Sequence, residues 1–247
     1  MEYFWSEEND IPEGLGFSLF GKEHLMFMAV SILLVFLWVF FYKRAGDKRR
    51  TFLIITALLL PALELWKILF LISVNRFGMG HLPLHFCSMA IYLYPAYAMM
   101  QKGRIKEVLG DFCCCVLLPA GLAAVIFPDW TMYPIMSFMS ISSFIWHTLQ
   151  TALPLCILFT EEVCADKKSF VYCVIILIIP AGFMYVFDVV FHCNYWFLLY
   201  PVPGPLEMIY KTFGTAMYLP ALSGMVLLVV FITWILIRKI KQKPFLT

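Results

Sequence analysis

The stretch "HLMFMAVSILLVFLWVFFYKRAGDKRR", residues 24–50, joins an uninterrupted apolar run to a cluster of five Lys and Arg residues. Residues 24–42 contain no Asp, Glu, Lys or Arg. At ~1.5 Å per residue, a helix of this length approaches the ~30 Å thickness of the hydrocarbon core of a membrane. Because Lys and Arg beside membrane helices are retained in the cytoplasm, the stretch predicts a transmembrane helix that ends on the inner side.

The same pattern continues through the chain. Of its 247 residues, 62% are hydrophobic and only 14% are charged, which is too little polar surface for a water-soluble globule. Six more runs are long enough to cross a membrane, at about 51–74, 82–100, 108–127, 133–160, 169–191 and 214–237. They are too long and too little alternating for barrel strands. We therefore expect an all-α, polytopic transmembrane bundle of seven spans, forming a single integral membrane domain over 1–247.

The basic residues predict the orientation of this bundle. Clusters at 43–50, 102–106, 167–168 and 238–243 hold 14 of the 18 Lys and Arg residues, and all four fall on the same side. This side should be cytoplasmic, which places the N-terminus outside and the C-terminus inside. The opening residues "MEYFWSEEND" have neither a basic leader nor an apolar core, so no cleavable signal peptide is expected. The net charge of +2 reflects topology and indicates no nucleic-acid partner.

Polar residues within and beside the spans indicate where function could reside. Glu64 and Lys67 lie one turn apart in the second span and can form a structural ion pair or line a polar path. Other polar residues map toward the outer end and predict a polar vestibule there: Asn75, Arg76, His81, His85, Asp188, His192, Glu207 and Lys211. The aromatic segment 192–213, with three prolines, is either an interfacial lid or a loop with a few interfacial anchors.

The segment "HLPLHFCSMA", residues 81–90, is the main chemical candidate. His81, His85 and Cys87 could bind a metal, but Pro83 places His81 before the helix and no second Cys/His pair has matching spacing, so we expect no metal. As a nucleophile, Cys87 needs a base, because an apolar setting disfavours the thiolate. His85 would lie on another helical face. His147, inside a later span, is the better partner, or else a hydrogen-bonded core histidine.

The remaining span cysteines are predicted to pack as small apolar side chains. They are Cys113, Cys114, Cys115, Cys156 and Cys173.

Several segments together resemble the YwaF family of bacterial integral membrane proteins. The resemblance is carried by "HLPLHFCSMAIYLYP", "SFIWHTLQTALPLCIL" and "CNYWFLLYPVPGPLEMIYKTFG", in this order, together with Glu64 in "ALELWK". That family is similar to animal membrane acyltransferases that remodel ether phospholipids through a cysteine, and more distantly to membrane hydrolases. The resemblance implies that Cys87 is the nucleophile, that His147 is its base or acid, and that the chain lies in a bacterial plasma membrane. Pro203 and Gly204 replace a Lys-Pro pair common in the family.

The leading hypothesis is a lipid acyltransferase or hydrolase that attacks phospholipid acyl esters through a Cys87–His147 dyad. Glu64, Lys67 and His85 are expected to support the dyad. The expected substrate-binding residues are Arg76, Asn194, Tyr195 and Lys211. Phospholipid or lysophospholipid is the expected partner, and no cofactor is required.

Two other classes of function stay open. In a transporter or small-solute binder, Glu64, Lys67 and Asp188 would line a polar path. In a structural or partner-binding membrane protein, the polar residues would only fasten helices together. The dyad also has a geometric requirement. Cys87 lies ~8 Å below the predicted outer helix end, whereas His147 lies ~21 Å into its span at ~1.5 Å per residue. The helix 133–160 must tilt or project outward to bring the two residues together.

Overall fold

The fold is all-α, as expected. The computed structural model describes residues 3–6, 8–160 and 163–242, so Lys243 of the basic cluster 238–243 lies outside the described residues. The α-helices are α1 (Lys22–Arg44), α2 (Arg49–Ser73), α3 (Met89–Met99), α4 (Arg104–Phe112), α5 (Leu118–Ile126), α6 (Phe138–Thr160), α7 (Lys167–Phe191) and α8 (Pro205–Gln242). Within the described ranges there is no strand.

Six helical passages are long and apolar enough to cross a membrane. They are Lys22–Arg44, Gly46–Ser73, Arg104–Ile126, Phe138–Phe159, Lys167–Phe191 and Pro205–Lys241. Large apolar side chains point outward from them, such as Ile32 and Ile179, which are 66% and 68% exposed. Contiguous apolar surface of this kind is normally covered by lipid or by another protein. The chain is therefore an integral membrane protein.

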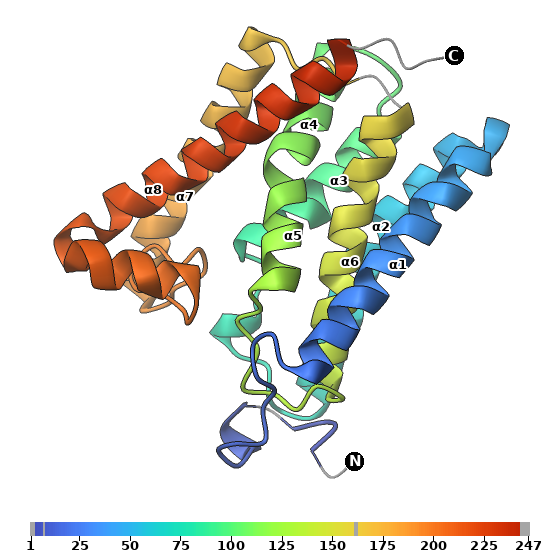
Figure 1. The fold of residues 1–247 in the computed structure, drawn as a ribbon. Coiled ribbons are helices and arrows are strands. Elements are labelled where there is room, and N and C mark those ends of the chain that lie inside the picture. Colours follow the sequence, from blue (N-terminus) through green and yellow to red (C-terminus); the bar gives the residue numbers. More distant parts are fainter. Residues whose placement is uncertain (1–2, 7, 161–162, 243–247) are drawn as a thin grey trace.

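The predicted third span, 82–100, does not form a continuous membrane helix. Its only α-helix is α3, whose 11 residues extend ~16 Å at ~1.5 Å each. The residues before α3 form two short 3-10 turns, Met79–His81 and Phe86–Ser88. Pro83 explains the interruption, because it lacks a backbone donor and forces Leu82 into an extended conformation. Six of the seven predicted spans are thus found as long helices, and the start of α1 and the end of α8 lie at opposite ends of the bundle (Figure 1).

The centre of the bundle is built from α4, α5 and α6. A π-helix, Cys113–Leu117, joins α4 to α5 in one buried passage. Pro119 lies one turn beyond Cys115 and offers no N–H to its carbonyl, which favours this local widening. Gly121 lets α5 approach α6 closely, because a Cβ there would lie 2.8 Å from Oγ1 of Thr151. In Figure 1, α1 and α2 lie on one side of this centre, and α7 and α8 lie on the other.

A proline in α6 fixes the position of α3. Pro154 lacks an N–H, so the carbonyl of Gln150 loses its usual helical partner. The hydroxyl of Tyr94, in α3, donates to that carbonyl at 2.7 Å. Tyr94 is completely buried, and an unsatisfied carbonyl at this depth would be costly. The bond therefore holds the short helix that follows Cys87 against the helix that carries His147.

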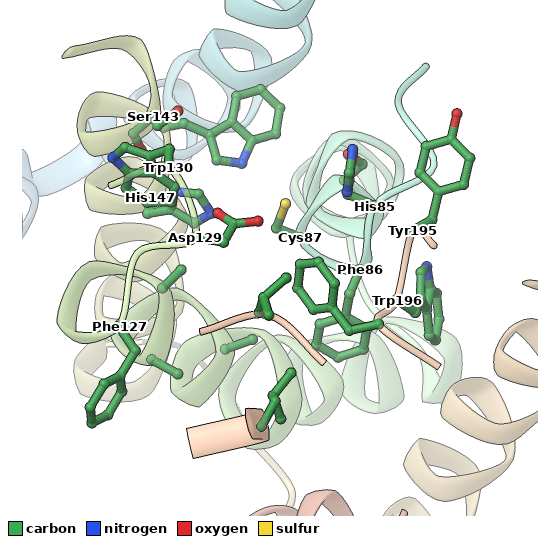
Figure 2. A pocket seen from close by; sticks show the side chains of 18 of the residues that line it. His85, Phe86, Cys87, Phe127, Asp129, Trp130, Ser143, His147, Tyr195 and Trp196 are labelled. Carbon is green, nitrogen blue, oxygen red and sulfur yellow. The ribbon is translucent and has the colours of Figure 1, made fainter. Parts of the chain in front are cut away.

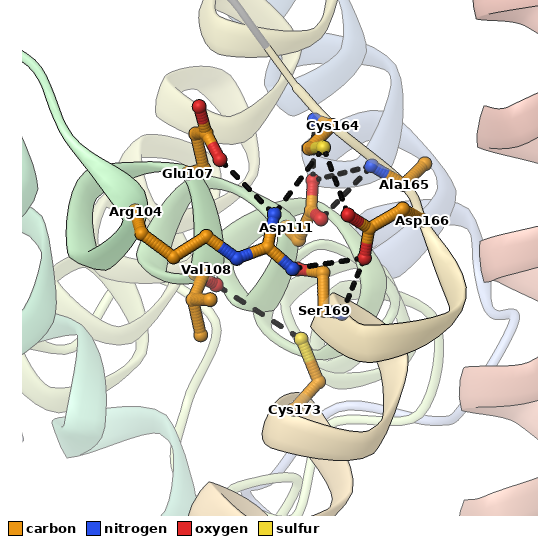
Figure 3. A network of polar contacts seen from close by, with 9 residues as sticks. All are labelled: Arg104, Glu107, Val108, Asp111, Cys164, Ala165, Asp166, Ser169 and Cys173. Atoms are coloured by element: carbon orange, nitrogen blue, oxygen red, sulfur yellow. Dashed lines mark hydrogen bonds and ion pairs between the residues drawn. The ribbon is translucent and has the colours of Figure 1, made fainter.

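The end of the bundle near the C-terminus is held by a polar network (Figure 3). Asp111 accepts hydrogen bonds from the backbone N–H groups of Cys164 and Ala165, at 3.0 and 2.9 Å. Asp166 caps the start of α7 and forms an ion pair with Arg104 at 2.9 Å. These contacts connect α4 to α7 at this end of the bundle. The cavity lies toward the other end.

The N-terminal segment packs over the connection between α5 and α6. The backbone N–H of Phe17 donates to the carbonyl of Thr131 at 3.0 Å. Gly16 is required for this approach, since a Cβ there would overlap the Thr131 carbonyl. A small apolar cluster forms beneath, made of Phe17, Val125, Trp130, Tyr133, Ile135 and Phe144. The cluster fixes Trp130 next to the central cavity.

Candidate active site

One cavity of about 730 Å³ brings together residues from most parts of the bundle. Its lining is polar in one part and apolar in another. The polar part of the wall contains Glu64, Lys67, His81, His85, Cys87, Asp129 and His147. The apolar part comes mainly from α5, α7 and α8. A cavity of this size and mixed lining is typical of a small-molecule or lipid site.

Cys87 lies in the 3-10 turn that precedes α3, and the outer loop holds its approach segment in place. The indole Nε1 of Trp196 donates to the carbonyl of Leu84 at 2.9 Å. The hydroxyl of Tyr195 donates to the carbonyl of Met79. Figure 2 shows the Cys87 thiol directed into the cavity. The loop 192–204 thus fixes the non-helical segment that presents this thiol.

His147 reaches the same cavity from α6. Its Nδ1 lies 2.8 Å from the carbonyl oxygen of Ser143, one turn earlier. Because a carbonyl can only accept, this bond requires a proton on Nδ1. In the neutral imidazole, Nε2 is then the acceptor and can serve as a base. Trp130 stacks on the ring, with centroids 5.0 Å apart and an angle of 11° between planes.

Asp129 is a residue of this site that the sequence did not single out. It belongs to the connection between α5 and α6 and lines the cavity. In Figure 2 its carboxyl group points into the space between Cys87 and His147. Burial raises the pKa of this carboxyl, while nearby His85 opposes the increase. In the sequence, Asp129 is an ordinary polar loop residue. Its position at the cavity depends on how the N-terminal segment packs around the neighbouring Trp130, which no sequence pattern indicates.

His85 also faces the cavity, on the other side of Cys87 (Figure 2). Its Nε2 lies 3.1 Å from the carbonyl oxygen of Gly80, so Nε2 donates and Nδ1 is left as the acceptor. The ring meets that of Tyr195 edge to face, with centroids 4.9 Å apart. His85 is therefore held by its own loop and by the outer loop, close to the thiol and the Asp129 carboxyl.

Glu64 and Lys67 form the ion pair that their spacing predicts, with 2.9 Å between Nζ and Oε1. Both residues line the cavity. A charge at membrane depth is costly unless it is paired or hydrated, and this pair satisfies both side chains at the cavity wall. The structure thus places this ion pair in the cavity wall.

Three residues expected to bind substrate lie elsewhere. Arg76 pairs with Asp10 at 2.6 Å, and Lys211 pairs with Glu207 at 2.5 Å. Asn194 is engaged inside the outer loop, where its side-chain amide donates to the carbonyl of Tyr200 at 2.8 Å. None of these three lines the cavity, whereas Tyr195, the fourth expected residue, does.

Asp188 is buried and supports the loop rather than a polar path. Both of its carboxylate oxygens lie 3.1 Å from the backbone N–H of Tyr195. It is fully buried and is not among the residues that line the cavity with Glu64 and Lys67. The structure therefore does not assemble the three-residue path of the transport hypothesis.

The alternative metal-binding set of His81, His85 and Cys87 is not grouped as three ligands in the part of the chain that the structure describes. Nδ1 of His81 accepts a hydrogen bond from the backbone N–H of Gly78 at 3.2 Å. Over the ranges that the structure describes, no three His, Cys, Asp or Glu side chains are grouped as ligands.

The apolar wall of the cavity includes one face of α5. Ala120, Ala123, Ala124 and Phe127 recur at helical spacing and all line the cavity. The same cavity is also lined by aliphatic residues of α7 and α8: Leu177, Ile178, Ala181, Leu222, Met225, Val226 and Leu227. The three alanines add little side-chain bulk to this part of the cavity wall.

Comparison with known proteins identifies the family. The chain belongs to the TMEM164 family, a membrane protein family whose model matches residues 19–241. The match includes every residue of the cavity wall. Searches of curated proteins and of solved structures found no match.

Proposed function

We propose that this member of the TMEM164 family is a membrane lipid acyltransferase or hydrolase that uses Cys87 as its nucleophile and His147 as its base. The observation that carries the proposal is the amphipathic cavity, whose lining includes the thiol and the imidazole together with many apolar side chains of α5, α7 and α8. A phospholipid acyl ester has the same division into a polar reacting group and a long apolar chain. The lining of the cavity therefore supports lipid acyl esters as the class of substrate.

The proposed reaction proceeds through a thioester. Nε2 of His147 takes the thiol proton as Sγ of Cys87 attacks the ester carbonyl, which forms the S–C bond. The bond between the acyl carbon and the lysolipid oxygen then breaks, and that oxygen takes the proton from His147. In the second half, His147 activates either a lysophospholipid hydroxyl or water, which releases the acyl group from sulfur. The acceptor decides between a transferase and a hydrolase.

The apolar wall accounts for the binding energy of such a substrate. Each methylene group transferred from water to an apolar surface contributes about 0.8 kcal/mol. A substrate that already lies in the bilayer gains less from this transfer, because its chain is already in an apolar medium. The role of the α5 face is therefore to orient the chain so that its ester lies beside Cys87, rather than to extract the lipid.

The test is chemical detection of the acyl-enzyme. Purified protein in phospholipid vesicles should acquire a hydroxylamine-labile acyl group on the peptide that contains Cys87, read by mass spectrometry. Cys87→Ala should lose both the adduct and lipid turnover. Cys113→Ala, which removes a fully buried thiol away from the cavity, should keep both. If folded Cys87→Ala turned over phospholipid at the wild-type rate, the proposal would be wrong.

A second measurement separates transferase from hydrolase. Adding lysophospholipid to the acylated protein should transfer the acyl group to the lysophospholipid hydroxyl, whereas water alone should release free fatty acid slowly. The opposite balance, with fatty acid as the main product at saturating lysophospholipid, would identify a hydrolase. Turnover of neither kind, together with solute uptake that depends on Glu64, would favour the transport hypothesis.

A further inference from the structure

The cavity places a carboxyl group where the proposed chemistry moves a proton. Figure 2 shows Asp129 directed into the space between the Cys87 thiol and the His147 ring. All three residues line the same cavity, although they come from three separate parts of the chain. Such a convergence of a thiol, a carboxyl and an imidazole is a candidate catalytic constellation.

The orientation of His147 directs its basic nitrogen toward a partner in the cavity. Its Nδ1 is occupied by the Ser143 carbonyl at 2.8 Å, and its ring is covered by Trp130. Only Nε2 is left to exchange a proton. Asp129 is held next to this ring because Trp130, its neighbour in the chain, is buried in the N-terminal cluster.

The groups around Asp129 favour a role in proton exchange over a role as a permanent ion. From the segment before α3, His85 lies near enough for its positive form to stabilise a carboxylate, and from α2 the Glu64–Lys67 ion pair lines the same cavity. Burial works against the carboxylate. A carboxyl balanced in this way can hold a proton on one oxygen while the other oxygen accepts a hydrogen bond.

We infer that Asp129 is a catalytic residue that relays the proton between Cys87 and His147, an inference that rests on the proposed function. In this step the carbonyl oxygen of neutral Asp129 takes the proton from Sγ, and its hydroxyl gives a proton to Nε2 of His147. At the end of this step Asp129 is neutral again. The thiolate then attacks the ester carbonyl, and the imidazolium of His147 can protonate the oxygen of the leaving lysolipid. The relay removes the need for direct contact between sulfur and imidazole.

Asp129→Asn tests the relay, because the amide has the same shape but cannot pass on a proton. Thioester formation from phospholipid should slow by about 10²–10⁴-fold, the usual size of a general acid–base contribution. Asp129→Glu should recover part of the rate. Asp129→Asn in a His147→Ala background should cause little further loss, since both changes interrupt one path.

Alkylation of Cys87 by iodoacetamide separates catalysis from structure. Alkylation needs only the thiolate in equilibrium with the thiol and no leaving-group protonation, so its rate does not depend on a proton relay. Asp129→Asn should therefore be alkylated at least as fast as the wild type at neutral pH, although its acylation is slow. A merely structural role would slow both reactions. Asp47→Asn, which makes the same chemical change in an exposed loop, should alter neither.

The outcomes distinguish this inference from the function on which it rests. If Cys87→Ala retained turnover, the proposed function and the relay would fail together. If Cys87 and His147 were both required while folded Asp129→Asn acylated within about twofold of the wild-type rate, only the relay would be wrong. Loss of both acylation and alkylation in Asp129→Asn would also overturn the relay, in favour of a structural role.

Discussion

The indole of Trp130 lies almost parallel to the imidazole of His147, with ring centroids 5.0 Å apart and an angle of 11° between the planes. Trp130 is itself held edge to face against Phe144, at 5.5 Å. The histidine is thereby fixed by a stacked ring on its face and by the Ser143 carbonyl at Nδ1. A base whose ring cannot rotate keeps its lone pair on Nε2 aimed in one direction.

Replacing Trp130 should therefore impair the chemistry more than its distance from Cys87 suggests. Trp130→Ala leaves a cavity, costs about 3–5 kcal/mol of stability and frees the His147 ring. Trp130→Phe keeps an aromatic face and should keep most of the acylation rate. The measurement is the rate of thioester formation on Cys87 together with thermal unfolding. Equal rates in folded Trp130→Ala and in wild type would show that the stacking does not orient the base.

Two of the three cavity histidines, His147 and His85, should differ in their effect. His147→Ala removes a ring whose Nδ1 is held by Ser143 and whose Nε2 can act as the base, and it should slow acylation by about 10²–10⁴-fold. His85→Ala removes a ring tied to Gly80 and Tyr195, and it should lower the rate less. Parallel acylation assays of the two variants, with folding checked by thermal unfolding, compare them. A larger loss in His85→Ala would transfer the role of base to that residue.

Asp129 should weaken the folded state at neutral pH. Burial raises the pKa of its carboxyl above the ordinary value of about 3.9, so the folded protein binds this proton more tightly than the unfolded chain does. The contribution of this group to stability is complete below the ordinary pKa and is lost as the pH rises through the raised pKa. Asp129→Asn should thus be more stable than wild type at pH 7, and the difference should vanish near pH 3. A destabilised Asp129→Asn at pH 7 would contradict this.

Asp166 should show the opposite pH dependence. Its hydrogen bond with Arg104, then the bond from the Ser169 N–H, lower the pKa of this carboxyl below its ordinary value. The resulting stability is present above the ordinary pKa and is lost as the pH falls toward the lowered one. Asp166→Asn keeps a side-chain oxygen that can cap α7 but loses the ion pair with Arg104, so it should cost only about 0.2–1 kcal/mol at neutral pH, and less in acid. Unfolding curves of Asp129→Asn and Asp166→Asn across pH 3–7 compare the two pH dependences of stability.

The topology predicted from the basic clusters can be tested by labelling. Tyr200 is exposed at the end of the bundle that holds the cavity, and Lys48 is exposed near the opposite end. A membrane-impermeant maleimide should label Tyr200→Cys in intact cells, and Lys48→Cys only after the membrane is opened. Labelling of both positions from the same side would imply an even number of crossings between them.

The sequence predicted the long helices well because their cause is local. Length and the exclusion of charge suffice to identify runs such as 24–42, whatever their neighbours are. The run 82–100 is similarly apolar, but its first part is not helical, because Pro83 forces Leu82 into an extended conformation. Hydropathy alone cannot distinguish a continuous helix from a broken segment buried among others.

The site was only partly predictable because hydropathy shows neither a break in a helix nor a contact between distant parts of the chain. The apparent difference in depth between Cys87 and His147 assumed a helix starting at 82. Because Cys87 lies in a 3-10 turn before a short helix, that assumption does not hold, and both residues line one cavity. Asp129 and Trp130 come into place through contacts with the N-terminal segment more than 100 residues earlier. Long-range contacts of this kind leave no periodic signal in a single sequence.

The α5 face should decide which acyl chains fit. Ala120 and Ala124 lie one turn apart on α5, and both line the cavity together with aliphatic residues of α7 and α8. Ala120→Phe would fill part of the cavity with an aromatic ring, while Cys87 and His147 would be unchanged. The variant should acylate normally with short acyl chains and poorly with long ones. Competition between phospholipids of different chain length, read as the mass of the acyl group on Cys87, measures this preference.

Leu122→Phe is the matched control for this prediction. Leu122 lies on the same helix but is 44% exposed and points away from the cavity, so the added ring should meet lipid rather than substrate. Its chain-length preference should equal that of the wild type. If Ala120→Phe also kept the wild-type preference, the acyl chain would lie elsewhere, and the apolar wall of α5 would serve only to pack the bundle. If short and long chains were lost equally in Ala120→Phe, the ring would instead have blocked access to Cys87 as a whole.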